Sequence, residues 1–126
     1  MLLLDSGAVS WFSRSSPQVV ALVKCLRSEG LWPPTVPTPV LIESLQGDSA
    51  RDAPANRLLK TCEVEEAVPV WLARRAAYLR RRAGRGSAVD ALVVAFAEPG
   101  GAVLTSDTGD LGALAGYAQD VIVERI

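Results

Sequence analysis

Short, wholly apolar runs alternate along the chain with longer segments in which apolar residues recur every three or four positions. The first run covers residues 1–4 and stops at Asp5-Ser6-Gly7, a pattern that predicts a buried strand followed by a turn. A second buried strand is predicted at residues 101–105, between Pro99-Gly100 and Ser106-Asp107. Weaker patterns predict extended segments at 32–36, 63–66 and 121–123.

Helical spacing fills the intervals between these strands. The clearest helix opens at Ser16-Pro17, an N-cap residue followed by a first-turn proline, and continues to Gly30. Another is predicted from Thr38-Pro39, with Thr38 as its N-cap, through about residue 46. The polar stretch 47–56 is a loop in which a helix restarts near Pro54. The remaining helices are predicted at 69–82, 87–98 and 111–115.

This alternation predicts one domain, residues 1–126, built on a parallel β-sheet of the α/β class. In such sheets, ligands bind beyond the carboxyl ends of the strands. Two carboxylates are expected at that edge, because Asp5 follows the first strand and Asp107 follows the strand at 101–105.

The composition narrows the chemistry, because the chain contains no histidine. Nucleophilic sites that use an imidazole base are excluded, and the commonest zinc ligand is missing. With 13 basic and 14 acidic residues the net charge is −1, so bulk charge does not attract nucleic acid, and any such contact needs a local patch. If the protein is an enzyme, carboxylates must carry its chemistry.

The cysteines and the N-terminus predict a cytoplasmic protein without membrane contact. Cys25 and Cys62 lie far apart and outside a C-x-x-C spacing, so we expect two buried thiols rather than a disulfide or a zinc site. The N-terminal apolar run ends after residue 4, which is too short for a signal peptide or a membrane span.

Asp90 is a lone acid in the apolar helix predicted at 87–98. Burial of an unpaired carboxylate costs several kcal/mol, so such a group usually pairs, becomes protonated or binds a cation. Ser87-x-x-Asp90 also matches a capping box, in which Asp90 bonds back to the start of the helix. The two interpretations are compatible, and both stay open.

Glu43 lies beyond the capping reach of Thr38, and alone it would be a solvated helix position. Asp5 and Asp107 taken singly also have a simple interpretation, as caps of the next helix. The set of four is more informative, because carboxylates that gather at one edge repel one another unless cations intervene. Oxygen ligands favour Mg²⁺ or Mn²⁺, and such ions support phosphodiester hydrolysis without histidine.

The ordered set of acids resembles the PIN domain, and within it most the VapC-type toxins of bacterial toxin-antitoxin pairs. The resemblance covers essentially the whole chain. It rests on Asp5-Ser6 after a strand, Glu43 in a helix, Asp90-Ala91 in an apolar helix, and Thr105-Ser106-Asp107-x-x-Asp110-Leu111.

The resemblance implies a three-layer α/β/α fold and a Mg²⁺- or Mn²⁺-dependent endoribonuclease that acts as the toxin of a type II pair. It also implies an RNA substrate, a cognate antitoxin that neutralises the toxin, and a toxin homodimer within their complex. In the metal site it places Asp5, Asp90 and Asp107. Glu43 would complete the catalytic set, either as a further ligand or by orienting the attacking water.

Other matched positions have supporting roles. The hydroxyls of Ser6 and Thr105 correspond to groups that support the carboxylates. Asp110 corresponds to a less constant acid, and it is equally consistent with a residue that starts a helix.

Six of the eleven arginines fall between residues 74 and 85. Because an arginine fork can bind phosphate through two hydrogen bonds, the run predicts a basic rim that contacts RNA or a protein partner. A solvated helix face or an antitoxin-docking surface would have the same composition. The candidate contact residues are Arg74, Arg75, Arg81, Arg82 and Arg85, while Trp11, Trp32 and Trp71 are expected in the core or a dimer interface.

Two other functions compete with the nuclease. The first is a catalytically inactive PIN-like interaction module, in which the acids only cap helices and the domain acts through its protein partner. The second is a phosphoacceptor or aspartyl-phosphatase domain, which would need a lysine after a late strand. That function is disfavoured because neither Lys24 nor Lys60 is in such a position.

Overall fold

The computed structural model describes all residues 1–126, and its five strands form one sheet. The strands are β1 (Leu2–Leu4), β2 (Thr35–Pro37), β3 (Glu63–Glu65), β4 (Ala102–Thr105) and β5 (Ile122–Arg125). Their order in the sheet is β3-β2-β1-β4-β5. Every pairing between neighbouring strands is parallel, so the predicted sheet type is confirmed.

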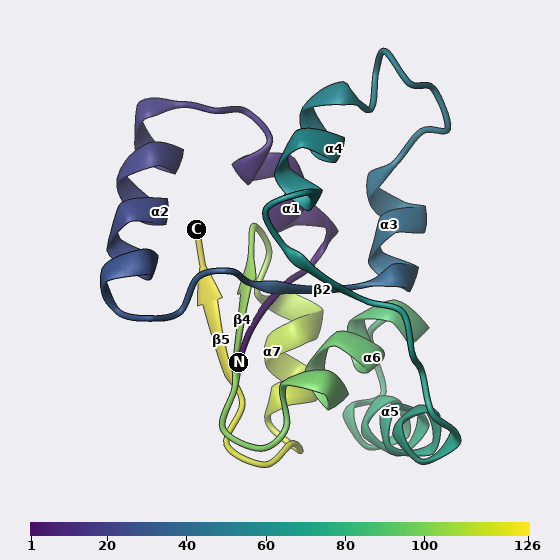
Figure 1. The fold of residues 1–126 in the computed structure, drawn as a ribbon. Helices are drawn as coiled ribbons and strands as arrows, with labels where there is room; N and C mark the ends of the chain where they lie inside the picture. The colour runs from purple at the N-terminus through teal and green to yellow at the C-terminus, as the bar shows by residue number, and fades with distance from the viewer.

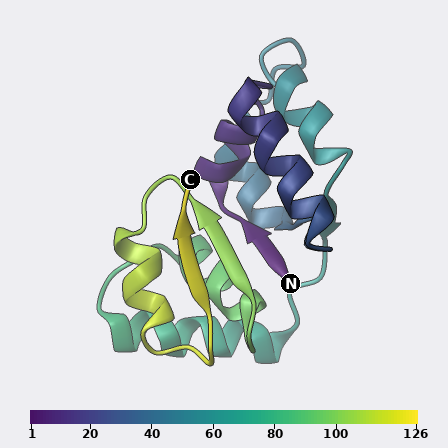
Figure 2. The ribbon, with the colours of Figure 1, turned by 90° about the vertical axis from the view of Figure 1, so that its left-hand side faces the viewer.

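Helices cover both faces of this sheet. The chain runs outward from β1 to β2 and β3, and then crosses back to β4 and β5, so right-handed crossovers place the early and late helices on opposite faces. The two groups lie on either side of the strands (Figures 1 and 2), which gives the expected three-layer α/β/α fold. The first group is α1 (Ser6–Phe12), α2 (Pro17–Ser28), α3 (Thr38–Ser44) and α4 (Ala53–Leu59); the second is α5 (Val70–Ala83), α6 (Ala88–Ala97) and α7 (Gly109–Ala115).

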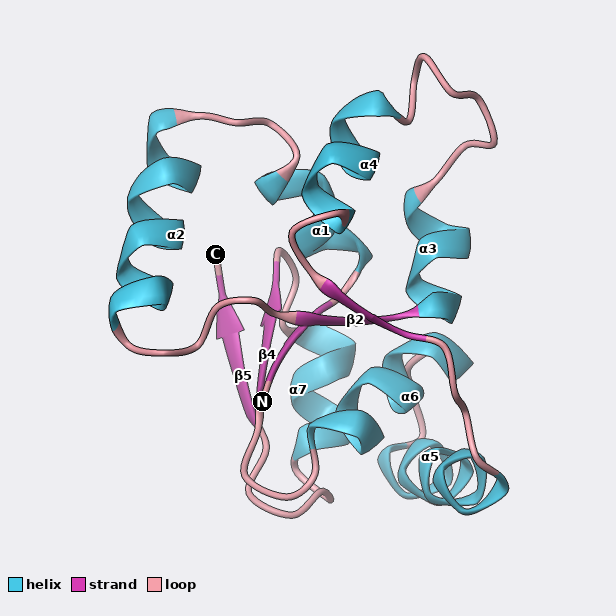
Figure 3. Cartoon of the chain, in the orientation of Figure 1, coloured by secondary structure: helices cyan, strands magenta, loops and turns pink.

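The core lies around the neighbouring strands β1 and β4, with helices on both sides of them (Figure 3). Leu3 and Leu4 of β1 and Val103 of β4 are fully or almost fully buried. The apolar helix α6 packs against both of these strands, which explains why its sequence is apolar on nearly every side. None of the helices is long and apolar enough to span a membrane.

Several local predictions differ from the structure. Residues 6–12 form α1 instead of a turn, because the Asp5 carboxylate accepts the N–H of Ala8 and starts a helix directly after β1. The N-cap of α3 is Pro37, and Thr38 is already the first helical residue. The exposed and half-buried positions of the Cys25 and Cys62 thiols contradict their predicted burial.

The three tryptophans divide between the core and the surface. Trp11 and Trp32 are partly buried and pack against the core, where both lie close to the ring of Phe12. Trp71 is 69% exposed at the start of α5. Its expected place in the core is therefore wrong, and a role at an interface stays a prediction.

Candidate functional site

Asp5 and Thr105 stand at the carboxyl ends of two neighbouring strands. Leu4 of β1 pairs with Leu104 of β4, and the N–H of Asp5 donates to the carbonyl of Leu104. The chain leaves β1 toward one face of the sheet and β4 toward the other (Figure 1). The two strand ends therefore border the point where the connections diverge, which is where open α/β sheets bind ligands.

Asp5 is held through both carboxylate oxygens. Oδ1 accepts the N–H of Ala8 at 2.7 Å, and Oδ2 accepts the hydroxyl of Thr105 at 2.5 Å. Partial burial raises the pKa of Asp5, and the negative charge of Asp90 raises it further, while the hydrogen bonds from Thr105 and Ala8 act in the opposite direction. Asp5 is thus a fixed carboxylate in a partly desolvated position.

Asp90 forms the capping box that its sequence predicts. The hydroxyl of Ser87 accepts the N–H of Asp90 at 3.0 Å, and Oδ2 of Asp90 accepts the N–H of Ser87 at 3.2 Å. The other carboxylate oxygen makes no hydrogen bond within the chain. A capping role for Asp90 is therefore confirmed, and one of its oxygens is left for another partner.

Glu43 reaches the same region from α3, which packs against α1. Partial burial raises the pKa of Glu43, and the negative charges of Asp90 and Asp5 raise it further. The chain has two salt bridges, Arg75–Glu98 and Arg85–Asp110, and neither involves Asp5, Glu43 or Asp90. Three acids from separate elements therefore lie close enough for their negative charges to interact, and no cationic side chain forms a salt bridge with any of them.

Asp107 lies at the same edge but is oriented by its own turn. Its N–H donates to the hydroxyl of Thr105 at 3.0 Å, and its Oδ1 accepts the N–H of Gly109 at 3.0 Å. Asp107 is exposed, whereas Asp5 and Asp90 are half-buried. The structure thus brings Asp5, Glu43 and Asp90 into electrostatic contact and leaves Asp107 at the rim.

The three supporting residues have different surroundings. Thr105 is completely buried and links Asp5 to the backbone of Asp107, as the resemblance implies. The hydroxyl of Ser6, the first residue of α1, makes no hydrogen bond within the chain. Asp110, in the first turn of α7, accepts a 2.7 Å hydrogen bond from Arg85 Nε.

As the side chains stand, no three acidic or cysteine residues are grouped to hold a metal ion. The chemistry of the donors nevertheless fits Mg²⁺ or Mn²⁺, because uncompensated carboxylate oxygens are the ligands these hard ions prefer. Asp5 and Asp90 each use one oxygen as a helix cap, and the second oxygen of Asp5 accepts the Thr105 hydroxyl. Asp5 would bind a cation by sharing its bonded oxygens, and Asp90 could turn its free oxygen toward the cation.

The arginines between residues 74 and 85 differ in the contacts that their side chains make within the chain. Arg75 is locked to Glu98 through two hydrogen bonds of 2.9 and 2.7 Å. The guanidinium of Arg82 lies 5.3 Å from the centre of the Tyr117 ring, and Arg80 Nε donates to the carbonyl of Gly86. Arg74 and Arg81 are exposed, and their side chains make no hydrogen bond within the chain. Arg85 belongs to the loop that leads into α6.

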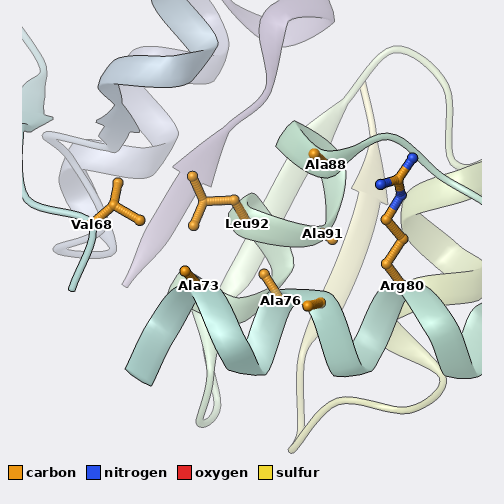
Figure 4. Close-up of a pocket in the computed structure, with 8 residues that line it drawn as sticks. Val68, Ala73, Ala76, Arg80, Ala88, Ala91 and Leu92 are labelled. Atoms are coloured by element: carbon orange, nitrogen blue, oxygen red, sulfur yellow. The ribbon is translucent and has the colours of Figure 1, made fainter. Parts of the chain in front are cut away.

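An apolar hollow of about 240 Å³ lies between α5 and α6. Ala88 and Ala91 of α6 face the α5 side chains of Ala76 and Arg80 across it (Figure 4). Arg80 is the only charged residue of its lining. None of the surface hollows is lined by Asp5, Glu43, Asp90 or Asp107. Of these acids, Glu43 and Asp107 are exposed, and Asp5 and Asp90 are half-buried.

Sequence reasoning missed two contacts that shape this edge. A side chain at Gly7 would collide with the hydroxyl of Ser106, so glycine lets the 105–107 turn sit on the first turn of α1. Asp52 is buried and accepts the backbone N–H groups of Gln46, Gly47 and Asp48, which fixes the chain just after α3. In the sequence, the first contact is marked only by a glycine three residues after the first strand, and the second only by an acid two residues before Pro54.

The sequence matches no model of a known protein family and no curated protein. Asp5 and Asp107 lie just beyond the ends of neighbouring parallel strands, at the edge where open α/β sheets bind ligands.

Proposed function

We propose that this protein is a Mg²⁺- or Mn²⁺-dependent endoribonuclease that hydrolyses RNA phosphodiester bonds at the acidic edge of the sheet. The observation that carries the proposal is the shared field of Asp5, Glu43 and Asp90. These acids come from separate elements, and no cationic side chain pairs with any of them. Partial burial raises the pKa of Asp5 and of Glu43, and the charge of Asp90 adds to both shifts. Such an arrangement is costly for the fold unless a cation binds there.

In this proposal Asp5, Asp90 and Asp107 hold the cation. When bound, it supplies an activated water and stabilises negative charge on the phosphate. The hydroxyl of Thr105 orients the carboxylate of Asp5, and the backbone N–H of Ser87 orients that of Asp90, so both carboxylates are positioned before substrate arrives. Glu43 has a raised pKa and an exposed side chain, which suit it to orient the attacking water and accept its proton.

The biological setting is proposed from the resemblance to PIN domains. The order of Asp5, Glu43, Asp90 and Asp107 along the chain, on a three-layer α/β/α fold, is similar to that of VapC-type toxins. We therefore extend the proposal to a cytoplasmic toxin that cleaves RNA, is neutralised by a cognate antitoxin, and acts as a homodimer within their complex.

The test is metal-dependent cleavage of a single-stranded RNA by the purified protein. Asp5→Asn and Asp90→Asn should each lower the rate at least a hundredfold without loss of the fold, because asparagine keeps the capping oxygen and removes the charge. The matched control is Asp120→Asn, which removes a carboxylate next to β5 at the amino ends of the strands. Cleavage that persists in EDTA, or that survives both site substitutions, would refute the proposal.

A second candidate function is a non-catalytic interaction module. It is favoured by the caps that Asp5 and Asp90 already form, and by the lack of a ready-made metal group. In that case the protein should show no specific Mn²⁺ binding that Asp90→Asn removes, because the carboxylate serves only as a cap and asparagine keeps the capping oxygen.

A further inference from the structure

The loop between α5 and α6 brings one arginine to the acidic edge. Arg85 Nε donates to Asp110 Oδ1 at 2.7 Å. One terminal nitrogen of Arg85 lies 3.4 Å from the point where a Cβ on Gly109 would stand, and Asp107 Oδ1 lies 3.3 Å from the same point. The guanidinium and the Asp107 carboxylate therefore flank Gly109, no further apart than the sum of these two distances.

The backbone on either side of Arg85 is firmly held. Gly84 ends α5 in the left-handed conformation, with φ of 67°. Gly86 has φ of 96°, and a Cβ there would lie 2.8 Å from the Leu114 side chain, so the loop sits directly on α7. Arg80 fixes it from the other side through a 3.1 Å hydrogen bond to the Gly86 carbonyl.

Stability alone does not account for the Arg85–Asp110 pair. The two side chains are 58% and 47% exposed, and exposed ion pairs contribute only about 0–1 kcal/mol to folding. Arg75, by contrast, uses Nε and a terminal nitrogen on the nearly buried Glu98. In Arg85 only Nε is engaged, so the terminal N–H groups are left for another acceptor.

An anionic polymer that approaches four carboxylates needs a compensating cation near the cleaved bond. Arginine is suited to this task, because its terminal N–H groups can donate two hydrogen bonds to one phosphate. Among the candidate arginines, Arg85 lies beside Asp107, on the other side of Gly109. The others nearby are bonded elsewhere or lie along α5.

We propose that Arg85 binds a backbone phosphate of the RNA next to the cleaved bond, and that Asp110 is a positioning residue that holds Arg85 through Nε. This inference rests on the nuclease function proposed above and deepens it. It assigns the substrate contact to one side chain of the arginine run.

Steady-state cleavage of an RNA oligonucleotide in Mn²⁺ tests the assignment. Arg85→Ala should raise KM about tenfold and change kcat less than threefold. The slope of log affinity against log salt should fall by about 0.7, the value for one lost phosphate contact on a single strand. Arg85→Lys should be intermediate, because lysine keeps the charge without the fork. Asp110→Asn should raise KM by a smaller factor and leave kcat unchanged.

The matched control is Arg51→Ala, which removes an exposed arginine from the loop between α3 and α4. If Arg85→Ala and Arg51→Ala have the same KM and salt slope, or if Arg85→Ala lowers only kcat, the assignment is overturned while the nuclease proposal stands. If the wild-type protein does not cleave RNA, the nuclease proposal fails. RNA affinity measured by anisotropy in EDTA then still tests Arg85, and equal affinities of the two alanine variants would overturn its role.

Discussion

Thr105 connects the carboxyl ends of the neighbouring strands β1 and β4. It is completely buried at the end of β4, where its hydroxyl donates to Asp5 Oδ2 and accepts the N–H of Asp107. A single hydroxyl therefore satisfies a carboxylate from one strand end and a backbone group from the other. The sequence places Asp5 just after one predicted strand and Thr105 at the end of another, and the parallel pairing of those strands makes the contact.

Replacing Thr105 by valine should remove the hydrogen bonds that the hydroxyl makes to the Asp5 carboxylate and to the N–H of Asp107. The substitution keeps the side-chain volume but leaves one oxygen of Asp5 and the N–H of Asp107 without a partner, so we expect a loss of about 1–3 kcal/mol in the free energy of unfolding. Cleavage should fall with it, because Asp5 loses its orientation. Urea denaturation and a cleavage assay check both effects. Thr105→Ser should restore most of each, and a valine variant as stable and active as wild type would contradict this role.

Among the secondary-structure elements, the helices whose starts carry a capping signal were the ones that the sequence predicted best. The capping box at Ser87 and Asp90 and the proline after Ser16 predicted the starts of α6 and α2, because both signals act within a few residues. The helix α1 was missed, because Asp5-Ser6-Gly7 is equally typical of a turn. Its helical form depends on the packing of Ala8, Val9 and Phe12 into the core.

A second element-scale feature is the seam between α5 and the end of α6. Glu98 pairs with Arg75 and also accepts the N–H of Gln119, and the bond from Arg75 is the main reason that the pKa of Glu98 lies below its ordinary value of 4.5. This ion pair joins segments that local sequence patterns do not connect, so no sequence signal marked it.

The seam should make stability depend on pH in a defined direction. Because the folded protein lowers the pKa of Glu98, its contribution is fully present above pH 4.5 and is lost as the pH falls through the lower folded value. Glu98→Gln should cost about 2 kcal/mol at pH 7, and this difference from wild type should vanish in acid. Urea denaturation at several pH values measures it. Glu124→Gln, on β5, is the control, and a constant cost for Glu98→Gln would argue against the ion pair.

At the scale of the whole molecule, topology brings the acids together. The predicted parallel sheet and the positions of the two acids after strands were enough to predict that Asp5 and Asp107 lie at one edge. The proximity of Glu43 could not be predicted in the same way, because it depends on how α3 packs against α1. The rim position of Asp107 likewise depends on its own turn with Gly109.

Titration calorimetry with Mn²⁺ measures whether Asp5 and Asp90 bind a divalent cation, on which the proposed function depends. Wild-type protein should show saturable binding that Asp5→Asn and Asp90→Asn each abolish and that Asp120→Asn leaves unchanged. Loss of binding is expected because each variant removes a ligand charge while it keeps the helix cap. Absence of saturable binding to the wild type, or equal binding by Asp90→Asn, would contradict the account and favour an interaction module whose acids only cap helices.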